Sequence, residues 1–502
     1  MSDFHKLSEG ILGEETTEKT NTELFLSLVG QYFPEAIKDG EVDFTALKEE
    51  MGEFAAVSSE HYDFTWAGKQ AAKKEAMSDI YGRTLKYKPQ DSLNPDTTEN
   101  IYIEGDNLEA LKLLRRNYHG KIKMIYIDPP YNTGSDFVYH DDFSMTEEEL
   151  AEKSGDVVDG VRYQKNGKDG SRYHTNWLNM MYPRLKIARE LLSDDGVIFI
   201  SIDDNEVGNL RKLCDIIFGD KNFRGQISRA TGTPTGQGTD RLVSEIDYIL
   251  LYSKSEEYYL NGVSFSEDDE KIYNLEDEYG RYLNRPLRKT GGEDRREDRP
   301  SMYYSILAPD DTPIYPIAPS GYQSRWRCSE ARYKELVSEH RIDWKYENDI
   351  WKVYQKFYLE GRTKQVSNLW TGLEGNKKAT ITIKQLLNKN LFDFPKPVEV
   401  LKQIQIISTE KDSIILDFFS GSATTAHAVM QLNAEDGGNR KFILVQLPEV
   451  CDEKSEAAKA GYRTICEIGK ERIRRAAKSL FNNLSHTHFC NIFPQLDNIT
   501  IS

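Results

Sequence analysis

Four consecutive residues of this sequence combine groups that could act on an amino group: Asp128, Pro129, Pro130 and Tyr131. They directly follow an apolar stretch, 123–127, that predicts a strand, and open α/β sheets bind their ligands at the carboxyl ends of strands. The prolines have no N–H to donate and stiffen the loop, while their carbonyl oxygens stay available as acceptors. The segment therefore presents a carboxylate, a rigid carbonyl and an aromatic face.

This combination suits the exocyclic amino group of a nucleobase. Adenine N6 is a poor nucleophile because its lone pair is delocalised into the ring. If Asp128 and the Pro129 carbonyl accept both of its hydrogens, the nitrogen gains sp³ character and its lone pair is aimed. Stacking on Tyr131 is worth about 1–3 kcal/mol, comparable to the few kcal/mol that extrusion of a base costs. The alternative is a rigid surface turn after a strand.

A second loop, 417–425, lies between an apolar strand and a helix and contains small residues around one glycine. Small side chains let the backbone approach a ligand, and the helix N-terminus offers unpaired N–H groups. One glycine is not the dinucleotide fingerprint, and a tight, well-packed turn is the alternative. The candidate binding residues of this loop are Asp417, Phe419, Ser420, Gly421, Ser422, Ala423 and Thr424.

Two further acids are candidates. Glu449 follows the next strand, where an acid can bind ribose hydroxyls, or it is an ordinary exposed glutamate. Its distance from Gly421 exceeds the usual spacing of about 20 residues, and the polar stretch 433–440 could absorb the excess. Asp106 precedes a predicted helix, where an N-cap is its simplest role.

Strand and helix signals alternate along most of the chain, which predicts an α/β fold with a mostly parallel, Rossmann-like sheet. The region 223–379 breaks this rhythm: it is rich in tyrosine and arginine and holds four of the six tryptophans, so we expect an inserted domain there. The expected strands are 101–103, 123–127, 197–202, 247–252, 413–418 and 441–447, and the expected helices are 107–117, 176–192, 206–218 and 424–432.

The 502-residue chain has a formal net charge of −17, and a uniformly acidic surface would repel nucleic-acid phosphates. The charge is uneven, however. Acidic residues are interspersed in the first of two basic clusters, so the pattern fits a phosphate-binding surface and a solvated, salt-bridged loop equally well. The clusters are Arg281, Arg285, Arg288, Lys289, Arg295, Arg296 and Arg299, then Arg325, Arg327, Arg332 and Lys334.

Several classes of protein lack support in the sequence. No apolar run is long enough to predict a membrane span, and the polar start of the chain does not read as a secretory signal. Five scattered cysteines without a Cys-x-x-Cys pair argue against a zinc ribbon or a disulfide framework and fit a reducing cytoplasm, where we expect the protein. We expect no metal site, and no ATP hydrolysis by this chain, because 372–378 has the wrong spacing for a phosphate loop.

The order of the motifs resembles a known family. The arrangement resembles that of the β-group of amino methyltransferases. In that group a loop like Asp128–Tyr131 comes first in the sequence, an insertion follows, and a loop like Phe419–Gly421 comes last. Over roughly residues 100 to 475, the chain resembles the modification subunits of type III restriction–modification systems specifically. The segments that carry this closer likeness are Glu104–Leu108, Ile202–Glu206, Asn376–Thr380 and Phe394–Pro397.

The resemblance implies sequence-specific transfer of a methyl group from S-adenosylmethionine to N6 of a flipped adenine in double-stranded DNA. Adenine is favoured because N4-cytosine enzymes more often carry Ser in place of Asp128. No metal is implied, because a sulfonium donor already carries a positive charge. The implied catalytic residues are Asp128, Pro129, Pro130 and Tyr131, and the implied cofactor-binding residues are Asp106, Asp128, Lys396, Pro397, Asp417, Phe419, Ser420, Gly421, Ser422, Ala423, Thr424 and Glu449.

Within that set, Phe419 and Gly421 would surround the methionine part of the cofactor, Asp106 would lie near its adenine and Glu449 near its ribose. The implied organisation is an N-terminal helical region (1–95), the catalytic half of a methyltransferase domain (96–222), an inserted target-recognition domain (223–379), the cofactor half (380–478) and an atypical tail (479–502).

Two features depart from the family's pattern. Ala423 stands where the family's Phe-x-Gly-x-Gly has its second glycine. The stretch 479–502 does not look like the family's C-terminal region, so we expect truncation or a frame change there, which would affect a homodimer and assembly with a restriction (helicase–nuclease) subunit.

Two other functions stay open: an N4-cytosine or RNA amino methyltransferase, and a DNA-binding or assembly subunit that no longer catalyses. The leading interpretation requires the segments around 128 and 421 to converge on one cleft.

Overall fold

The computed structural model describes residues 21–38, 41–52, 63–92, 98–133, 137–140, 157–158, 161–165, 173–232, 242–483 and 496–501. It divides into two compact units. We call them the sheet unit, Met1–Asn261 with Ser367–Ser502, and the inserted unit, Gly262–Val366.

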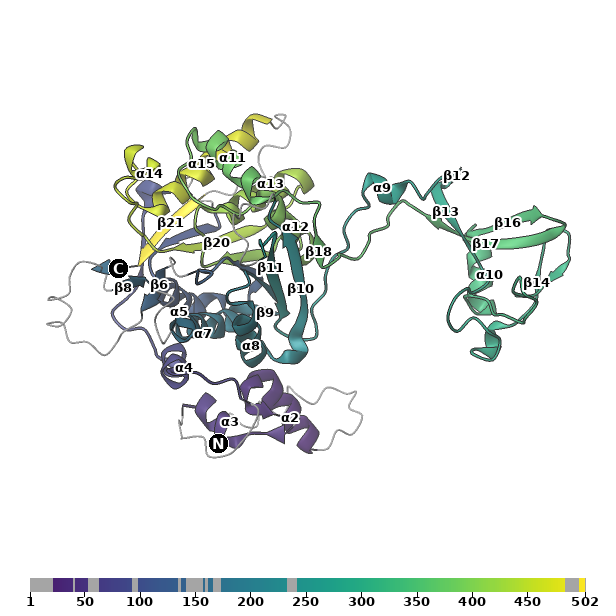
Figure 1. The fold of residues 1–502 in the computed structure, drawn as a ribbon, viewed down its shortest axis with the longest axis horizontal. Helices are drawn as coiled ribbons and strands as arrows, with labels where there is room; N and C mark the ends of the chain where they lie inside the picture. Colours follow the sequence, from purple (N-terminus) through teal and green to yellow (C-terminus); the bar gives the residue numbers. More distant parts are fainter. Residues whose placement is uncertain are drawn as a thin grey trace. The chain divides into compact units, whose positions relative to one another are not determined.

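The sheet unit is built on ten strands: β3 (Leu85–Tyr87), β4 (Asn100–Glu104), β5 (Ile122–Ile127), β9 (Leu192–Ile202), β10 (Phe223–Ala230), β11 (Ile246–Ser253), β18 (Leu369–Trp370), β19 (Ile414–Asp417), β20 (Lys441–Gln446) and β21 (Leu496–Ile501). Their order across the sheet is β18-β10-β11-β9-β5-β19-β20-β4-β21-β3 (Figure 1). The run β9-β5-β19-β20-β4-β21 is parallel throughout, and β11 joins it antiparallel to β9.

Helices cover both faces of this sheet. On one side, α7 (Tyr173–Leu191) packs against α4 (Lys69–Met77), α5 (Asn107–Tyr118) and α8 (Val207–Phe218), and on the other α13 (Thr424–Asp436) packs against α12 (Val398–Ser408) and α15 (Ile465–Asn483) (Figure 1). All six residues of β5 are buried, as expected for a parallel strand between two helical layers. The predicted α/β, Rossmann-like fold is confirmed, and every strand and helix predicted within it is present.

The strand order creates a switch point between β5 and β19. After β5 the chain continues through α7 to β9 on one side, whereas after β19 it continues through α13 to β20 on the other. Open α/β sheets bind ligands outside the carboxyl ends of the strands at such a point. The loops that follow β5 and β19 are therefore the expected ligand-binding loops.

The chain before the sheet contributes α2 (Asn21–Tyr32), η1 (Pro34–Ala36), β1 (Ile37–Lys38), β2 (Glu41–Val42), α3 (Phe44–Glu50) and η2 (Pro89–Asp91). The remaining elements of the sheet unit are β6 (Phe137–His140), β7 (Val157–Val158), β8 (Val161–Lys165), η3 (Asp220–Asn222), α11 (Asn376–Leu387) and α14 (Glu456–Lys459). None of the helices in the described ranges is long and apolar enough to cross a membrane.

The inserted unit has its own small core around Leu287, Trp326 and Val353. Its elements are α9 (Glu267–Glu270), β12 (Leu275–Asp277), β13 (Gly280–Pro286), η4 (Pro300–Met302), β14 (Ile306–Leu307), β15 (Pro313–Ile314), α10 (Glu330–Ser338), β16 (Ile342–Glu347) and β17 (Ile350–Tyr358). Strands β12, β13, β17 and β16 form one antiparallel sheet.

This unit is narrower than the insertion predicted at 223–379. Strands β10, β11 and β18, which fall inside the predicted range, extend the main sheet beyond β9. The strand predicted at 247–252 is β11, but the predicted insertion includes it, because antiparallel strands added to an edge do not continue the strand–helix alternation. In the predicted tail, the backbone of β21 pairs with both β4 and β3.

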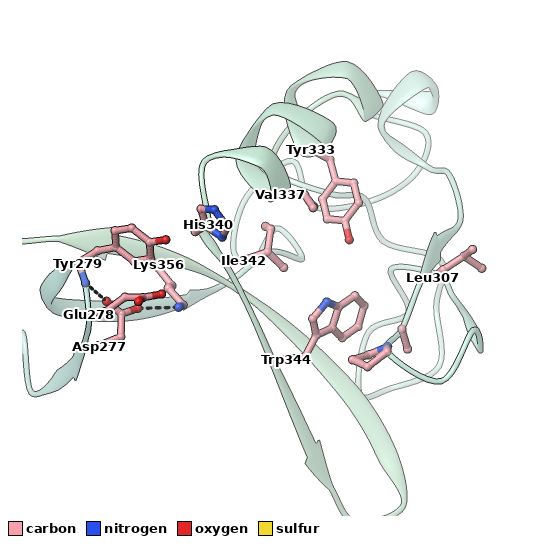
Figure 2. A pocket seen from close by; sticks show the side chains of 12 residues that line it. Asp277, Glu278, Tyr279, Leu307, Tyr333, Val337, His340, Ile342, Trp344 and Lys356 are labelled. Atoms are coloured by element: carbon pink, nitrogen blue, oxygen red, sulfur yellow. Dashed lines mark hydrogen bonds and ion pairs between the residues drawn. The ribbon is translucent and has the colours of Figure 1, made fainter.

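The inserted unit also carries a hollow of about 490 Å³. Aromatic side chains line it: Tyr279 stacks on His340 with ring centroids 5.3 Å apart, and Tyr333 and Trp344 lie opposite (Figure 2). On its acidic side Asp277 is paired with Lys356 at 2.7 Å, so the charge there is already partly neutralised (Figure 2).

Candidate active site

The two motif loops meet at one edge of the sheet. Strands β5 and β19 are parallel neighbours, with Met124 beside Ile415 and Ile125 beside Leu416. Asp128 directly follows β5 and Asp417 ends β19, so the loops that they begin leave the sheet side by side. The convergence that the sequence interpretation required is present.

The other acidic candidates lie at the same edge. Asp106 follows β4 and Glu449 follows β20, and the four strands β5, β19, β20 and β4 are consecutive and parallel. The carboxyl ends of parallel strands share one edge, so all four predicted site segments are brought together by strand order.

The Asp128 carboxylate is paired with Lys396, which lies just before α12. The Lys396 ammonium donates to Oδ1 at 2.7 Å and to Oδ2 at 2.6 Å, and it lies 4.9 Å from the centre of the Tyr131 ring. Asp128 nevertheless keeps a quarter of its side chain exposed. Since an ionised carboxylate has about four acceptor sites, it can hold Lys396 and still accept another N–H group.

The two prolines have different environments. The Pro130 carbonyl accepts a hydrogen bond from the Trp177 indole at 2.7 Å, which fixes the loop against α7. The Pro129 carbonyl has no donor within the described part of the chain. Of the two proline carbonyls, only that of Pro129 is without a hydrogen-bond donor from the described residues.

The side chain of Tyr131 has a buried hydroxyl end. The ring packs against the core of the sheet unit, and the buried hydroxyl has no hydrogen-bond partner among the described residues. Burial, reinforced by the negative charge of Asp128, raises the pKa of Tyr131 well above its ordinary value. The hydroxyl therefore stays protonated, and the ring face is the part of Tyr131 that can serve a ligand.

Asp417 is buried and is hydrogen-bonded within its own loop. It is 2 % exposed, and its carboxylate accepts hydrogen bonds from the Thr425 hydroxyl at 2.5 Å and the Phe419 N–H at 3.1 Å. Burial, with a smaller contribution from the charge of Asp128, raises the pKa of Asp417 to about 7 against these two hydrogen bonds. Its oxygens hold the start of the loop.

Phe419 and Gly421 are the partly exposed residues of the second loop, whereas Ser420, Ser422, Ala423 and Thr424 are buried. Gly421 adopts a left-handed conformation (φ 50°) and donates its N–H to the Gln446 side chain at 2.6 Å. A Cβ at this position would lie 3.2 Å from the Phe392 ring. Both the left-handed turn and the close approach of the Phe392 ring favour glycine at this position.

Arg472, from α15, holds the buried side of this loop. Its guanidinium donates to the Ser422 hydroxyl at 2.8 Å and to the Thr424 hydroxyl at 2.7 Å. It is 1 % exposed, has no carboxylate partner in the described ranges, and burial lowers its pKa to about 9. Ala423, in place of the expected glycine, takes the left-handed conformation (φ 64°) that starts α13.

Asp106 and Glu449 differ in how much of their carboxylate is free. Asp106 caps α5 through the N–H groups of Leu108 and Glu109 and also accepts from Arg184. Glu449 is half-buried, burial raises its pKa, and no described residue pairs with its side chain. Pro397 is buried at the start of α12, next to Lys396.

Comparison with known proteins identifies the family. The family model described as DNA methylase matches residues 122–478. The chain belongs to this DNA methylase family. It is 37 % identical over 449 residues to the type III restriction–modification enzyme EcoPI Mod subunit of Escherichia phage P1, a match that covers 84 % of this chain and 69 % of the relative.

Two other Mod subunits are similarly close. The StyLTI Mod subunit of Salmonella typhimurium is 36 % identical, with 84 % of this chain and 64 % of the relative covered, and the EcoP15I Mod subunit of Escherichia coli is 34 % identical, with 84 % and 70 % covered. The methylase is therefore a member of the type III Mod group, and it spans about two thirds of the length of these relatives.

Sequence reasoning did not find three side chains that shape the methylase site: Trp177, Gln446 and Arg472. Each acts on a loop that is remote in sequence, and no spacing pattern connects them to it. Arg472 lies in a basic run of α15 that reads as an ordinary helix surface.

Proposed function

We propose that this methylase transfers a methyl group from S-adenosylmethionine to N6 of an extruded adenine in double-stranded DNA. The observation that carries the proposal is the adjacency of β5 and β19. This adjacency places the loop with the Asp128 carboxylate and the Pro129 carbonyl, which suit an amino group, beside a loop suited to a cofactor. Membership of the DNA methylase family indicates that the reaction of these two loops is methyl transfer.

The residues present fit the cofactor. Ser422, Thr424 and Thr425 have backbone N–H groups without partners among the described residues at the start of α13, where a carboxylate is favoured. The Glu449 carboxylate, with which no described side chain pairs, suits a ribose hydroxyl. Bound there, S-adenosylmethionine would supply a methyl group activated by the positive charge of its sulfonium.

The catalytic loop would prepare the amine. Asp128 accepts one N–H of the adenine amino group and the free Pro129 carbonyl accepts the other, which aims the nitrogen lone pair. The Tyr131 ring stacks on the base. Lys396 keeps the Asp128 carboxylate oriented, and the remaining lone pairs of that carboxylate bind the amine. These contacts strengthen as the nitrogen becomes tetrahedral, so they favour the transition state over the bound base.

The DNA backbone would bind an arginine cluster on the inserted unit, defined by Arg285, Arg288, Arg325 and Arg327. The cluster lies on two adjoining segments, joined by a bridge between Arg288 and Trp326. Burial and the three neighbouring arginines lower the pKa of Arg327. Among the described residues the one ion pair of this cluster joins Arg288 to Asp294 at 4.0 Å, so a net positive charge remains for phosphates.

The relatives' names suggest the setting of the reaction. As a type III Mod subunit, the methylase would mark its recognition sequence and associate with a restriction subunit in the cytoplasm. A homodimer is a further proposal, which native mass spectrometry of the purified chain would test.

Transfer of labelled methyl groups to mixed-sequence DNA, followed by nucleoside analysis, tests the function. N6-methyladenine is the expected product. N4-methylcytosine, or label in RNA, would contradict the choice of target. Retained binding of S-adenosylmethionine without any transfer would instead identify a non-catalytic subunit.

A further inference from the structure

We propose that Glu206 is a positioning residue that holds the catalytic loop through Asn132. The inference rests on the proposed function, since it concerns the same loop. Glu206 belongs to the segment Ile202–Glu206, which carries part of the family likeness but has no role in the chemistry described above.

Glu206 is a fully buried carboxylate on which three side chains converge. Its relative exposure is 0 %, and its Oε1 accepts hydrogen bonds from the Asn132 amide at 2.5 Å and pairs with the His174 ring at 2.6 Å. Its Oε2 accepts from the Asn209 amide at 2.8 Å. A carboxylate at this position has enough acceptor sites to receive all three groups at once.

Asn132 transmits this contact to the loop, because it directly follows Tyr131. Its side chain is 0 % exposed, and its backbone is left-handed (φ 58°), a conformation that asparagine tolerates better than most residues. The amide also donates to the Tyr173 carbonyl of α7 at 3.4 Å. The end of the catalytic loop is therefore tied to both α7 and α8.

The simpler role for Glu206 is to cap α8, which it immediately precedes. The observed hydrogen bonds do not support that role, because the Glu206 side chain makes no capping bond to the α8 backbone. Both carboxylate oxygens are instead directed at side chains, one of them from the loop. Together with the Trp177 bond to the Pro130 carbonyl, the Glu206–Asn132 contact holds the loop without using Asp128 or the Pro129 carbonyl.

Kinetics of Glu206→Ala and Glu206→Gln on the full chain test the proposal. Glu206→Ala should lower kcat between about tenfold and a hundredfold, since a displacement of ~1 Å at a reacting group costs up to about 10²-fold. Its affinity for S-adenosylmethionine should stay within about twofold, because no hydrogen bond joins Glu206 to the second loop, 417–425. Glu206→Gln retains an oxygen for Asn132 and should recover most of kcat.

Asn132→Gly supplies a second route, since glycine keeps the left-handed backbone while removing the amide. It should reproduce the loss of kcat, and the Glu206→Ala/Asn132→Gly double variant should lose no more than either single variant, because both break one contact. Asn205→Ala, at an exposed position of the same segment, is the matched control and should leave kcat unchanged.

The outcomes are distinguishable. No transfer by the unmodified chain would overturn the proposed function. Normal transfer by the unmodified chain with full kcat in Glu206→Ala, or additive losses in the double variant, would overturn the positioning role. Glu206→Ala could instead lose kcat and cofactor binding in proportion, without rescue in Glu206→Gln. That result would mean a merely structural role for Glu206 and would also overturn the positioning role.

Discussion

Two aspartates lie at the carboxyl ends of neighbouring strands of the same sheet, yet they differ in exposure and in their partners. Asp128 keeps a quarter of its side chain exposed and is paired with a lysine, while Asp417 is 2 % exposed and accepts hydrogen bonds from its own loop. Burial raises the pKa of Asp417 to about 7. The residue type and the position relative to the strand are therefore insufficient to identify the catalytic acid.

The cations beside the two loops differ in the same way. Lys396 pairs with the carboxylate of Asp128, whereas Arg472 binds hydroxyl groups of the second loop without a carboxylate partner in the described residues. The first loop is thus arranged to present charge to a ligand, and the second to present backbone. Five substitutions test this contrast.

Asp128→Ala should have the largest effect, a fall in kcat of at least about 10²–10³-fold, because it removes a pre-organised acceptor of the amine. Radiolabel transfer to DNA measures kcat, and calorimetric titration with S-adenosylmethionine should show binding largely intact. Substantial activity in this variant would remove Asp128 from the catalytic role.

Asp417→Asn should change the pH dependence of stability. The folded-state pKa of Asp417, about 7, lies above its ordinary 3.8, so folding stability is lost as pH rises from about 4 to 7 and is then constant. The three-unit shift corresponds to an upper limit of about 4 kcal/mol. Asparagine does not titrate, so the stability of the variant relative to the unmodified chain should rise across this window in urea denaturation. Parallel pH curves for the two proteins would contradict the burial argument.

Arg472→Met should weaken S-adenosylmethionine binding by about tenfold or more, since hydrogen bonds from a charged donor to the loop are worth about 1.5–3 kcal/mol. Arg472→Lys keeps the charge and one donor and serves as the partial-rescue control. An unchanged dissociation constant in the methionine variant would show that the loop holds its shape without Arg472.

Lys396→Met should lower kcat by at most about fivefold, because a partly exposed ion pair contributes about 1 kcal/mol or less to the orientation of Asp128. Single-turnover transfer separates this from product release. Faster transfer by the variant would mean that Lys396 competes with the amine for Asp128 and does not orient it.

Tyr131→Phe should have the smallest effect, within about twofold in kcat, since both rings stack on a base and the hydroxyl is buried away from hydrogen-bond partners. Tyr131→Ala, which removes the ring, should cost about 1–3 kcal/mol of base binding. A large loss in the phenylalanine variant would assign the hydroxyl a role that the ring contact does not explain.

The sequence by itself determined local features of this protein: the loops that follow β5 and β19, the acids after β4 and β20, and part of the sheet unit. The elements predicted are strands β4, β5, β9, β11, β19 and β20 and helices α5, α7, α8 and α13. These features depend on apolar periodicity and on short-range backbone preferences, which neighbouring residues encode. The family likeness of Asp128–Tyr131 and Phe419–Gly421 depends on the same local information.

The tertiary structure alone decided which of these groups are free to act. Strand pairing brings positions almost three hundred residues apart to one edge of the sheet. Burial then makes the pKa of Asp417 differ from that of an ordinary aspartate, and a hydrogen bond from Trp177 occupies the Pro130 carbonyl but not that of Pro129. Contacts from Trp177, Glu206 and Arg472 come from residues in or next to helices that are remote in sequence. Desolvation and hydrogen-bond satisfaction depend on every neighbour in space, and for that reason no local pattern in the sequence could supply them.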